Sequence, residues 1–220
     1  HGIQRHMEIL LSRLSPNPRP KLKLETYTLD SKSASRFLYV AGCMHDDVLD
    51  KRVIDLGCGT GVLAIGAALL GAKFTVAVDI DKDSLLVAKE NAAKIGVDVN
   101  YVAGDIDAVH NSFDTTLMNP PFGSWSRGAD VKFLEKALKI STIVYSLHKR
   151  SPSNRRFLVG KISSLGGRVD RVFELEISLP HTFDFHRKKK YLVNADLYRI
   201  ARLKGEQDPL TDRSSIVGSL

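Results

Sequence analysis

The chain has 220 residues, a length that fits one domain with a full core but would be cramped for two. Its formal charge of +7 favours an anionic partner such as nucleic acid. Its 43% hydrophobic and 26% charged content is ordinary for a soluble globular protein, and the two cysteines, Cys43 and Cys58, exclude a disulfide framework or a cysteine-rich metal site. No apolar run approaches the ~18–20 residues that cross a bilayer and no signal-peptide pattern opens the chain, so we expect a cytoplasmic protein with no membrane partner.

The N-terminal part predicts two helices joined by a stiff connection. Apolar side chains recur at helical spacing over residues 3–14, and the proline-rich residues 15–20 cannot continue that helix. Asp30 or Ser31 is expected to cap a second helix that runs to about residue 44. We therefore divide the chain into an N-terminal helix and linker (1–20), a main domain (21–205) and a C-terminal tail (206–220).

Strands and helices then alternate along most of the chain. Buried strands are predicted at 53–56, 74–78, 99–102, 114–118 and 142–146, with helices at 62–70, 83–94, 131–139 and 153–165. This alternation indicates right-handed β-α-β units and a parallel sheet. Residues 168–179 and 192–203 alternate over a longer span and predict an antiparallel pair at one edge. The expected fold class is α/β, with a doubly wound, mostly parallel seven-stranded sheet.

A glycine-rich turn, Asp-Leu-Gly-Cys-Gly-Thr-Gly over residues 55–61, follows the first predicted strand. Its glycines are spaced G-x-G-x-G, whereas the dinucleotide fingerprint is G-x-G-x-x-G. The acidic residue two positions before the first glycine would repel a pyrophosphate but attract a cation, and S-adenosylmethionine carries an ammonium and a sulfonium. We therefore expect this cofactor to contact Asp55, Gly57, Gly59, Thr60, Gly61 and Val62.

Acidic side chains also follow the second and third predicted strands. Asp79 is placed to accept from both ribose hydroxyls of a nucleoside. Asp105 can accept from an adenine amine, with Ile106 beside it as an apolar contact. Each could instead be an ordinary helix cap, but their position after successive strands favours a methyl-donor site.

Asn119, Pro120, Pro121 and Phe122 follow the fourth predicted strand and form a stiff bracket. The prolines fix two φ angles and remove two donors, and the first pushes Asn119 towards an extended conformation. The Asn119 oxygen and a proline carbonyl can accept from the two hydrogens of an amine, while Phe122 stacks on its ring. These four residues are the candidate catalytic set, and Asn119 is also expected to contact the cofactor. The alternative is a strand-to-loop turn with a buried phenylalanine.

With these motifs, the chain resembles the class I S-adenosylmethionine-dependent methyltransferases, and more closely the methyltransferase-like-five family. The bracket matches the [DN]-P-P-[FYW] signature of enzymes that methylate nitrogens of planar groups, and residues 144–149 and 185–189 are more specific. The resemblance implies a Rossmann-like fold and methyl transfer to the exocyclic N6 amine of an adenine in small-subunit ribosomal RNA. S-adenosylhomocysteine would be the product, and eukaryotic members work with a small zinc-binding activator subunit.

One segment departs from the family pattern. Family members usually carry Glu-Gln-Tyr-x-Thr near the N-terminus, where the Gln and Thr touch the cofactor. Here residues 25–29 read Glu-Thr-Tyr-Thr-Leu, so Thr26 replaces the Gln and Leu29 falls on the Thr position. Thr26 and Thr28 are therefore the candidate cofactor contacts in this segment.

Basic residues in two places are candidates for RNA binding. They are His148, Lys149, Arg150, Arg155 and Arg156 after the fifth strand, and His186, Arg187, Lys188, Lys189 and Lys190 between the last two strands. Phe183, Phe185 and Tyr191 interleave aromatic rings with the second group, a pattern suited to unpaired bases and phosphates. The alternatives are a solvated charged loop and, for His148, a core histidine at the end of a strand.

Three other functions compete with RNA methylation. A release-factor glutamine methyltransferase uses a similar bracket for a planar amide, but Phe122 in place of Tyr and the basic loop count against it. A DNA adenine methyltransferase generally needs a further recognition domain, and only 98 residues follow the bracket. A non-catalytic RNA-binding scaffold would have no physical need for Asn119. No metal site is expected.

Overall fold

The computed structural model describes residues 2–19, 28–121, 128–179 and 191–205. Its helices are α1 (Gly2–Leu11), α2 (Ser31–Leu38), the π-helix η2 (Tyr39–Met44), α3 (Val62–Leu69), α4 (Lys82–Ile95), the 3₁₀ helix η3 (Ile106–Ala108), α5 (Ala129–Ile140) and α6 (Pro152–Ser164). Its strands are β1 (Arg52–Leu56), β2 (Phe74–Asp79), β3 (Asn100–Ala103), β4 (Phe113–Met118), β5 (Ser141–Lys149), β6 (Gly167–Leu179) and β7 (Tyr191–Arg202).

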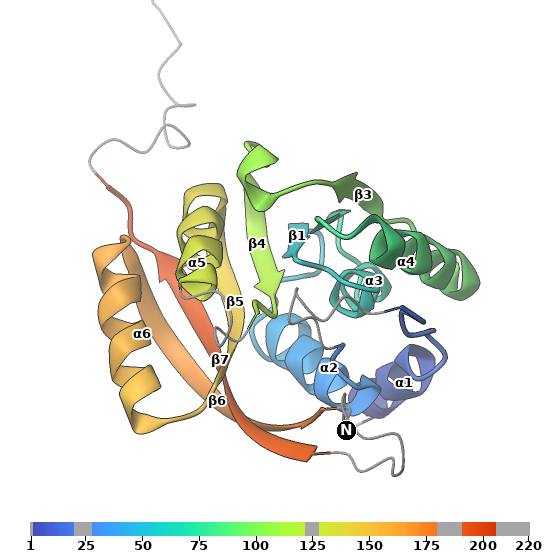
Figure 1. Ribbon diagram of the computed structural model, residues 1–220, viewed down its shortest axis with the longest axis horizontal. Coiled ribbons are helices and arrows are strands. Elements are labelled where there is room, and N and C mark those ends of the chain that lie inside the picture. The colour runs from blue at the N-terminus through green and yellow to red at the C-terminus, as the bar shows by residue number, and fades with distance from the viewer. Residues whose placement is uncertain (1, 20–27, 122–127, 180–190, 206–220) are drawn as a thin grey trace, which may run out of the picture.

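These strands form one seven-stranded sheet in the order β3-β2-β1-β4-β5-β7-β6 (Figure 1). The first five strands are parallel, and β7 runs antiparallel to both β5 and β6. The predicted fold class is therefore confirmed, including the antiparallel pair at one edge. The strand order reverses between β1 and β4, which is where ligands bind in sheets of this kind.

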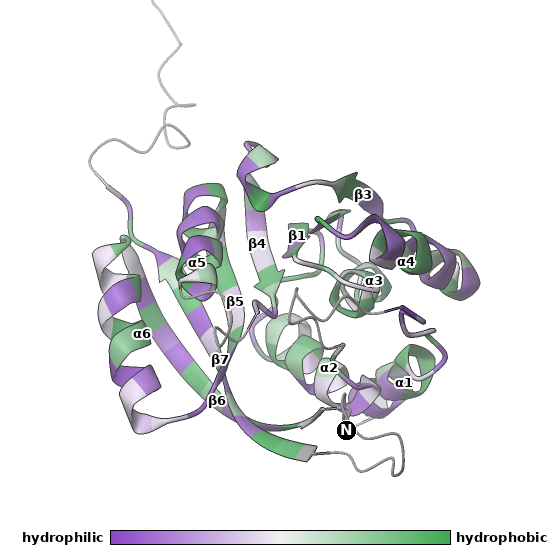
Figure 2. Cartoon of the chain, viewed as in Figure 1, coloured by the Kyte–Doolittle hydropathy of each residue, from purple (hydrophilic) through white to green (hydrophobic). Residues whose placement is uncertain are grey.

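Helices cover both faces of the sheet and bury two separate apolar layers. One layer packs α1, α2 and α3 on one face, around side chains such as Phe37, Leu38 and Ile65. The other packs α5 and α6 on the opposite face, around Leu134, Leu138 and Leu158. Figure 2 shows helices such as α4 and α5 with both hydrophobic and hydrophilic residues, as expected for helices that pack one side on a sheet. No helix in the described ranges is long and apolar enough to cross a membrane.

The second predicted helix differs from the observed one. Asp30 caps α2 by accepting from the Ser33 backbone N–H at 3.3 Å, but regular α-helix ends at Leu38. A π-helical stretch, η2, then carries the chain to Met44. The wider turn leads into Asp47, whose backbone N–H donates to the Ala41 carbonyl at 2.9 Å.

Asp47 fastens this N-terminal layer to the sheet. Its buried carboxylate accepts from the Tyr145 hydroxyl on β5 and from Arg199 Nε on β7 at 3.0 Å. Arg199 also pairs with Asp170 on β6. The Thr115 hydroxyl on β4 donates to the Asp47 carbonyl at 2.6 Å, so one loop residue contacts three strands.

Arg199→Met tests this connection. The substitution leaves the Asp47 carboxylate buried without its cation, so we expect a loss of about 3–5 kcal/mol of unfolding free energy in chemical denaturation. The double variant Asp47→Asn/Arg199→Met should recover much of that loss, because no unpaired charge remains. A double variant that is less stable than Arg199→Met would contradict this explanation.

Candidate functional site

The predicted cofactor and target residues meet at the reversal point of the sheet. In the register, Leu56 of β1 lies between Val78 of β2 and Met118 of β4. Gly57 follows β1 and Asn119 follows β4, so both residues lie at the same edge of the sheet. Neighbouring strands lie about 4.8 Å apart, so the glycine turn and the bracket begin side by side.

The glycine turn needs glycine at its bends. Gly57, Gly59 and Gly61 have φ values of +72°, +54° and +89°, in the left-handed region that other residues rarely adopt. The Gly57 backbone N–H donates to the Val78 carbonyl at 2.8 Å, which ties the turn to β2. A Cβ added at Gly59 would meet no atom within 4 Å, so open space lies in front of the middle of the turn.

Asp55 lies beneath this turn, and its carboxylate takes part in the fold. Its Oδ2 accepts from the Ala64 backbone N–H in the first turn of α3 at 3.1 Å, and the N-cap residue of this helix, Gly61, has no side chain to accept from these N–H groups. A negative charge is favourable at a helix N-terminus. Burial nevertheless raises the pKa of Asp55 to about 8; the Ala64 hydrogen bond opposes this shift and the nearby charge of Asp79 adds to it.

Asp79 joins the turn to the start of α4. Its Oδ2 accepts from the Gly59 N–H at 2.8 Å and its Oδ1 from the Asp81 N–H at 2.8 Å. Burial raises the pKa of Asp79, and the two backbone hydrogen bonds limit the rise. Asp81 in turn caps α4 and accepts from the Ser84 hydroxyl at 3.0 Å. The chain thus holds the predicted ribose acceptor directly beside the turn.

Asp105 follows β3 on the same edge of the sheet, but it is exposed. Its Oδ1 accepts from the Asp107 N–H at 2.9 Å, as the cap of η3, and from Lys132 Nζ of α5 at 2.9 Å. The Asp107 hydrogen bond and Lys132 lower its pKa, so it stays ionised. A contact with an adenine amine would use the other oxygen. Ile106 is buried in the layer beneath α5.

The bracket begins where β4 ends. Asn119 is partly exposed at the sheet edge, Pro120 is buried, and Pro121 is partly exposed. Three other predicted cofactor residues, Thr60, Gly61 and Val62, are buried in the turn and at the start of α3. Thr28 is exposed before α2. Thr26, Phe122 and the stretch from His186 to Lys190, with Arg187, Lys188 and Lys189, lie outside the described residues.

Asn91 is a site residue that the sequence reasoning missed. It is fully buried on α4, donates from Nδ2 to the Thr60 carbonyl at 3.1 Å and to the Ser15 carbonyl at 3.0 Å, and accepts from the Ser15 N–H at 2.8 Å. Asn17 Nδ2 adds a bond to the Ser84 hydroxyl at 3.0 Å. One amide therefore binds the glycine turn and the proline-rich linker to the same helix.

The expected contact of His148 with RNA is wrong, because its ring lies in the core. The side chain is 2% exposed, its Nε2 lies 2.6 Å from the Ser146 hydroxyl, and it packs edge-on against Tyr198. Burial lowers its pKa to about 4, although Asp196 lies nearby, so the ring is neutral at pH 7. Lys149, in contrast, is exposed at the end of β5.

The described geometry fits S-adenosylmethionine. Gly59 leaves space for a ligand to approach the backbone of the turn. Two buried carboxylates, those of Asp55 and Asp79, lie close enough for the charge on one to raise the pKa of the other. A cationic ligand would relieve that repulsion. Within the described ranges, no cluster of three or more His, Cys, Asp or Glu side chains could hold a metal ion.

Asp55→Asn should flatten the pH dependence of stability in the cofactor-free protein. Because the folded pKa of Asp55 lies near 8 and the unfolded one near ~4, the folded state holds a proton that the unfolded state loses between these values. Wild-type unfolding free energy should therefore fall as pH rises from 5 to 8, and the variant should lose less. Asp98→Asn changes an exposed aspartate and serves as the control. If the unfolding free energies of the wild type and of Asp55→Asn changed with pH in parallel, this explanation would be contradicted.

Asn91→Leu should lower both stability and cofactor affinity. It removes three hydrogen bonds and leaves the buried Thr60 carbonyl and the partly buried Ser15 carbonyl without this donor, which we expect to cost about 2–3 kcal/mol in chemical denaturation. Calorimetry should show weaker S-adenosylhomocysteine binding, because Thr60 loses its support. Lys94→Ala removes only exposed contacts to the same linker and should change neither measurement. Equal losses in both variants would argue against a specific role for Asn91.

The comparisons with known proteins agree with this site. The methyltransferase small domain family matches residues 29–140. The rRNA N(6)-adenosine-methyltransferase METTL5 of Danio rerio is 36% identical over 202 residues, which cover 89% of this chain and 97% of the relative. Mettl5 of Drosophila melanogaster is 34% identical over 203 residues, which cover 89% and 94%.

A solved structure extends the similarity to three dimensions. A Pyrococcus horikoshii protein, provisionally described as an RNA methyltransferase, has a TM-score of 0.85 and 38% identity, over 91% of this chain and 98% of that one. The sequence and fold similarities both cover the glycine turn and the bracket. The chain belongs to the METTL5-like family of class I S-adenosylmethionine-dependent methyltransferases.

Proposed function

We propose that this protein transfers a methyl group to the N6 amine of an adenine in RNA, and that the RNA is small-subunit ribosomal RNA. The observation that carries the proposal is the β1–β4 register, by which Gly57 and Asn119 follow the strands side by side. A methyl donor on the turn and an amine on the bracket would then be neighbours. The printed names of the fish and fly relatives, both rRNA N(6)-adenosine-methyltransferases, support ribosomal RNA as the substrate.

The bracket would act by positioning the amine. S-adenosylmethionine supplies a methyl group on a sulfonium. The adenine amine is a weak nucleophile because its lone pair is delocalised into the ring. Asn119 Oδ1 and the Pro120 carbonyl would accept its two hydrogens, which favours a tetrahedral nitrogen with its lone pair directed at the methyl carbon. The product amine then sheds its proton to solvent, so the rate gain comes from orientation and electrostatics.

The target base must leave any stack to reach the bracket. We propose that Phe122 receives the face of the extruded adenine. Lys149 and Arg155, together with the basic residues His186, Arg187, Lys188, Lys189 and Lys190, are the proposed contacts with the RNA backbone. An RNA substrate of this kind also supports our expectation of a cytoplasmic protein.

We further propose that a small zinc-binding subunit activates this protein. The support is the family resemblance. Co-purification from the native host, followed by mass spectrometry and zinc analysis, tests it. A small zinc-containing partner that raises the methylation rate is the expected result, and full activity of the isolated chain would contradict it.

Methyl transfer from radiolabelled S-adenosylmethionine to ribosomal RNA, DNA and a release factor tests the proposed substrate. We expect label in the small-subunit RNA, recovered as N6-methyladenosine after digestion. Label in the release factor would instead support the glutamine methyltransferase, and label in DNA the DNA adenine enzyme. No label in any substrate would support the non-catalytic scaffold.

Asn119→Ala should abolish methylation while leaving cofactor affinity nearly intact. The substitution removes an acceptor for the target amine but none of the described groups that hold the turn, which are Val78, Asp79 and Asn91. Methylation assays and calorimetry with S-adenosylhomocysteine measure the two effects separately. If both fell by the same factor, the contact of Asn119 with the cofactor would account for the lost methylation, and its proposed role in positioning the amine would be refuted.

A further inference from the structure

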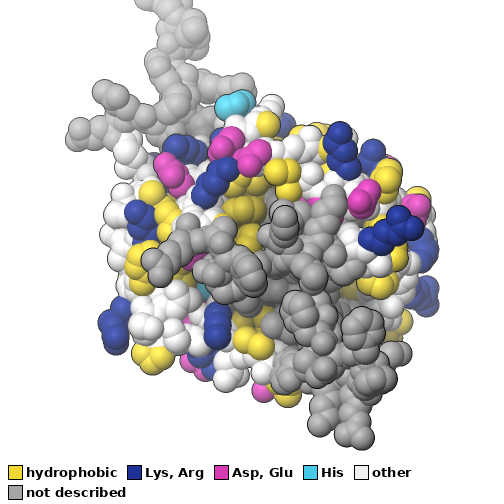
Figure 3. Space-filling model, in the orientation of Figure 1, with side chains coloured by type: hydrophobic (Ala, Val, Ile, Leu, Met, Phe, Trp, Pro, Cys, Tyr) yellow, Lys and Arg dark blue, Asp and Glu magenta, His cyan; other side chains and the backbone are white. Residues whose placement is uncertain are grey.

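A hollow of about 660 Å³ opens on the surface where β5 passes into α6. Its lining comes from the β5–α6 connection and one side of α6, and includes Arg150, Pro152, Arg155, Arg156, Val159 and Gly160. We call it the α6 groove. It combines three guanidinium groups with a small apolar wall. In Figure 3, Lys and Arg side chains lie beside hydrophobic ones over this part of the molecule.

The α6 groove lies on the same edge of the sheet as the bracket. Met118 of β4 pairs with Ser146 of β5, so the residues that follow them, Asn119 and Leu147, lie side by side. Arg150 lies three residues beyond Leu147, a distance of about 10 Å along an extended chain. Neighbouring nucleotides of one RNA strand can span that distance.

A buried carboxylate fixes two of the arginines in place. Asp196 of β7 is fully buried and accepts from Arg150 Nε at 3.1 Å and from Arg155 Nε and Nη2 at 2.9 and 2.7 Å. Arg150 also donates to the carbonyls of Leu175 and Ala195 at 3.2 and 3.1 Å. The guanidinium groups are thus oriented before any ligand arrives, which lowers the entropic cost of binding.

An exposed carboxylate bridges the same two arginines. Glu174 of β6 places one oxygen 3.2 Å from Arg150 Nη1 and the other 3.2 Å from Arg155 Nη2, and its side chain is 59% exposed. Such exposed ion pairs contribute little net stability. The phosphodiester of an RNA strand carries one negative charge, as a carboxylate does, and its two non-bridging oxygens can accept from arginine in the same bidentate way. Arg156 is exposed beside them, and none of the described side chains is paired with it.

We propose that the α6 groove binds the phosphate of a nucleotide next to the target adenine in the same RNA strand. The phosphate takes the place of the Glu174 carboxylate on Arg150 and Arg155, and Arg156 adds a third contact. Val159 and Pro152 offer an apolar surface to the ribose or base. This inference rests on the proposed function and specifies which part of the substrate Arg155 and its neighbours contact.

Two variants, one that removes a positive charge and one that removes a negative charge, test the α6 groove. Arg156→Ala should weaken binding of a fluorescein-labelled small-subunit RNA fragment about tenfold and reduce the salt slope of log K by about 1, because one phosphate contact is lost. Glu174→Gln should tighten binding severalfold, because the competing carboxylate is gone. Anisotropy titrations at several salt concentrations measure both effects.

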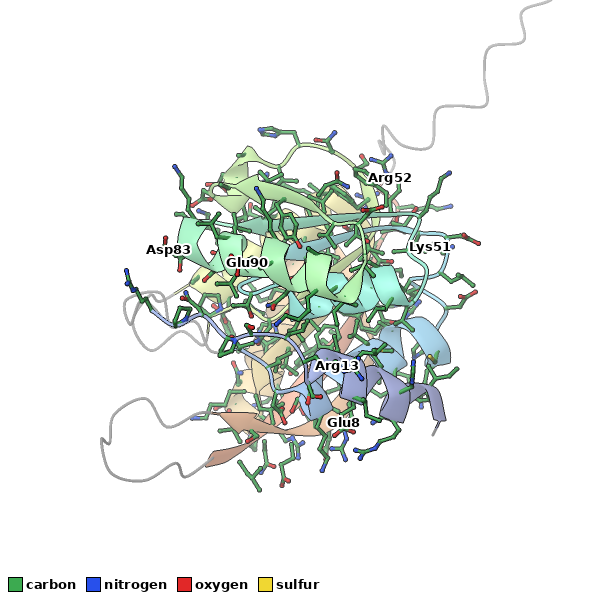
Figure 4. The ribbon with its side chains drawn as sticks, turned by 90° about the vertical axis from the view of Figure 1, so that its right-hand side faces the viewer. Glu8, Arg13, Lys51, Arg52, Asp83 and Glu90 are labelled. Atoms are coloured by element: carbon green, nitrogen blue, oxygen red, sulfur yellow. The ribbon has the colours of Figure 1, made fainter. Side chains whose placement is uncertain are left out.

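Matched controls separate a local effect from total charge. Arg13→Ala, just after α1, and Glu90→Gln, on α4, make the same charge changes on the opposite face, where Figure 4 shows both residues on the outside of the molecule. They should change RNA affinity less than twofold. Unfolding midpoints and S-adenosylhomocysteine affinity should match the wild type in all four variants.

The outcomes also separate this inference from the proposed function. If the wild type methylates the RNA but Arg156→Ala binds it unchanged, or Glu174→Gln binds it more weakly, the α6 groove is not a phosphate site and the methyltransferase assignment stands. If the groove takes an acidic protein segment instead, neither variant will alter RNA affinity. If the wild type transfers no methyl group to RNA, the proposed function fails and this inference fails with it.

Discussion

The pairing of β1 with β4 is the constraint on which the rest of the site depends. A parallel register that brings Leu56 level with Met118 also brings the residues that follow them, Gly57 and Asn119, to one point of the sheet edge. A slip of one residue would turn each side chain of β4 to the other face. The apolar layers on both sides of the sheet therefore fix the register, and the register sets the distance between turn and bracket.

The buried carboxylates are the part of this site that opposes folding. Asp55 and Asp79 lie under the turn, where burial raises both pKa values, and backbone N–H groups of Ala64, Gly59 and Asp81 oppose that rise. These hydrogen bonds hold the two carboxylates in place, although no cationic side chain is paired with them in the described structure of the turn. A ligand that carries positive charge would stabilise them. The Asp47–Arg199 pair at another part of the sheet already has its cation, which suits a structural role.

Most of the fold and the centre of the site could be predicted from local features of the sequence. Hydrophobic alternation, the glycines of the turn and the acidic residues near the ends of the first three strands are features of neighbouring residues, and the strands, turn and bracket followed from them. The π-helical end of the second helix, the Asn91 clamp and the burial of His148 arise from contacts between distant segments. A lone Asn on α4 has no local mark of burial, and β5 is covered on both faces, so alternation could not show that His148 faces inward.

The central claim is that the target amine sits between the Asn119 side chain and the methyl donor. A crystal structure of the protein with S-adenosylhomocysteine and an adenosine-containing oligonucleotide tests it most directly. The account predicts the adenine N6 atom within about 2.7–3.2 Å of Asn119 Oδ1, and the cofactor sulfur on the opposite side, over the glycine turn. An adenine bound elsewhere, or an Asn119 side chain directed away from the base, would contradict it.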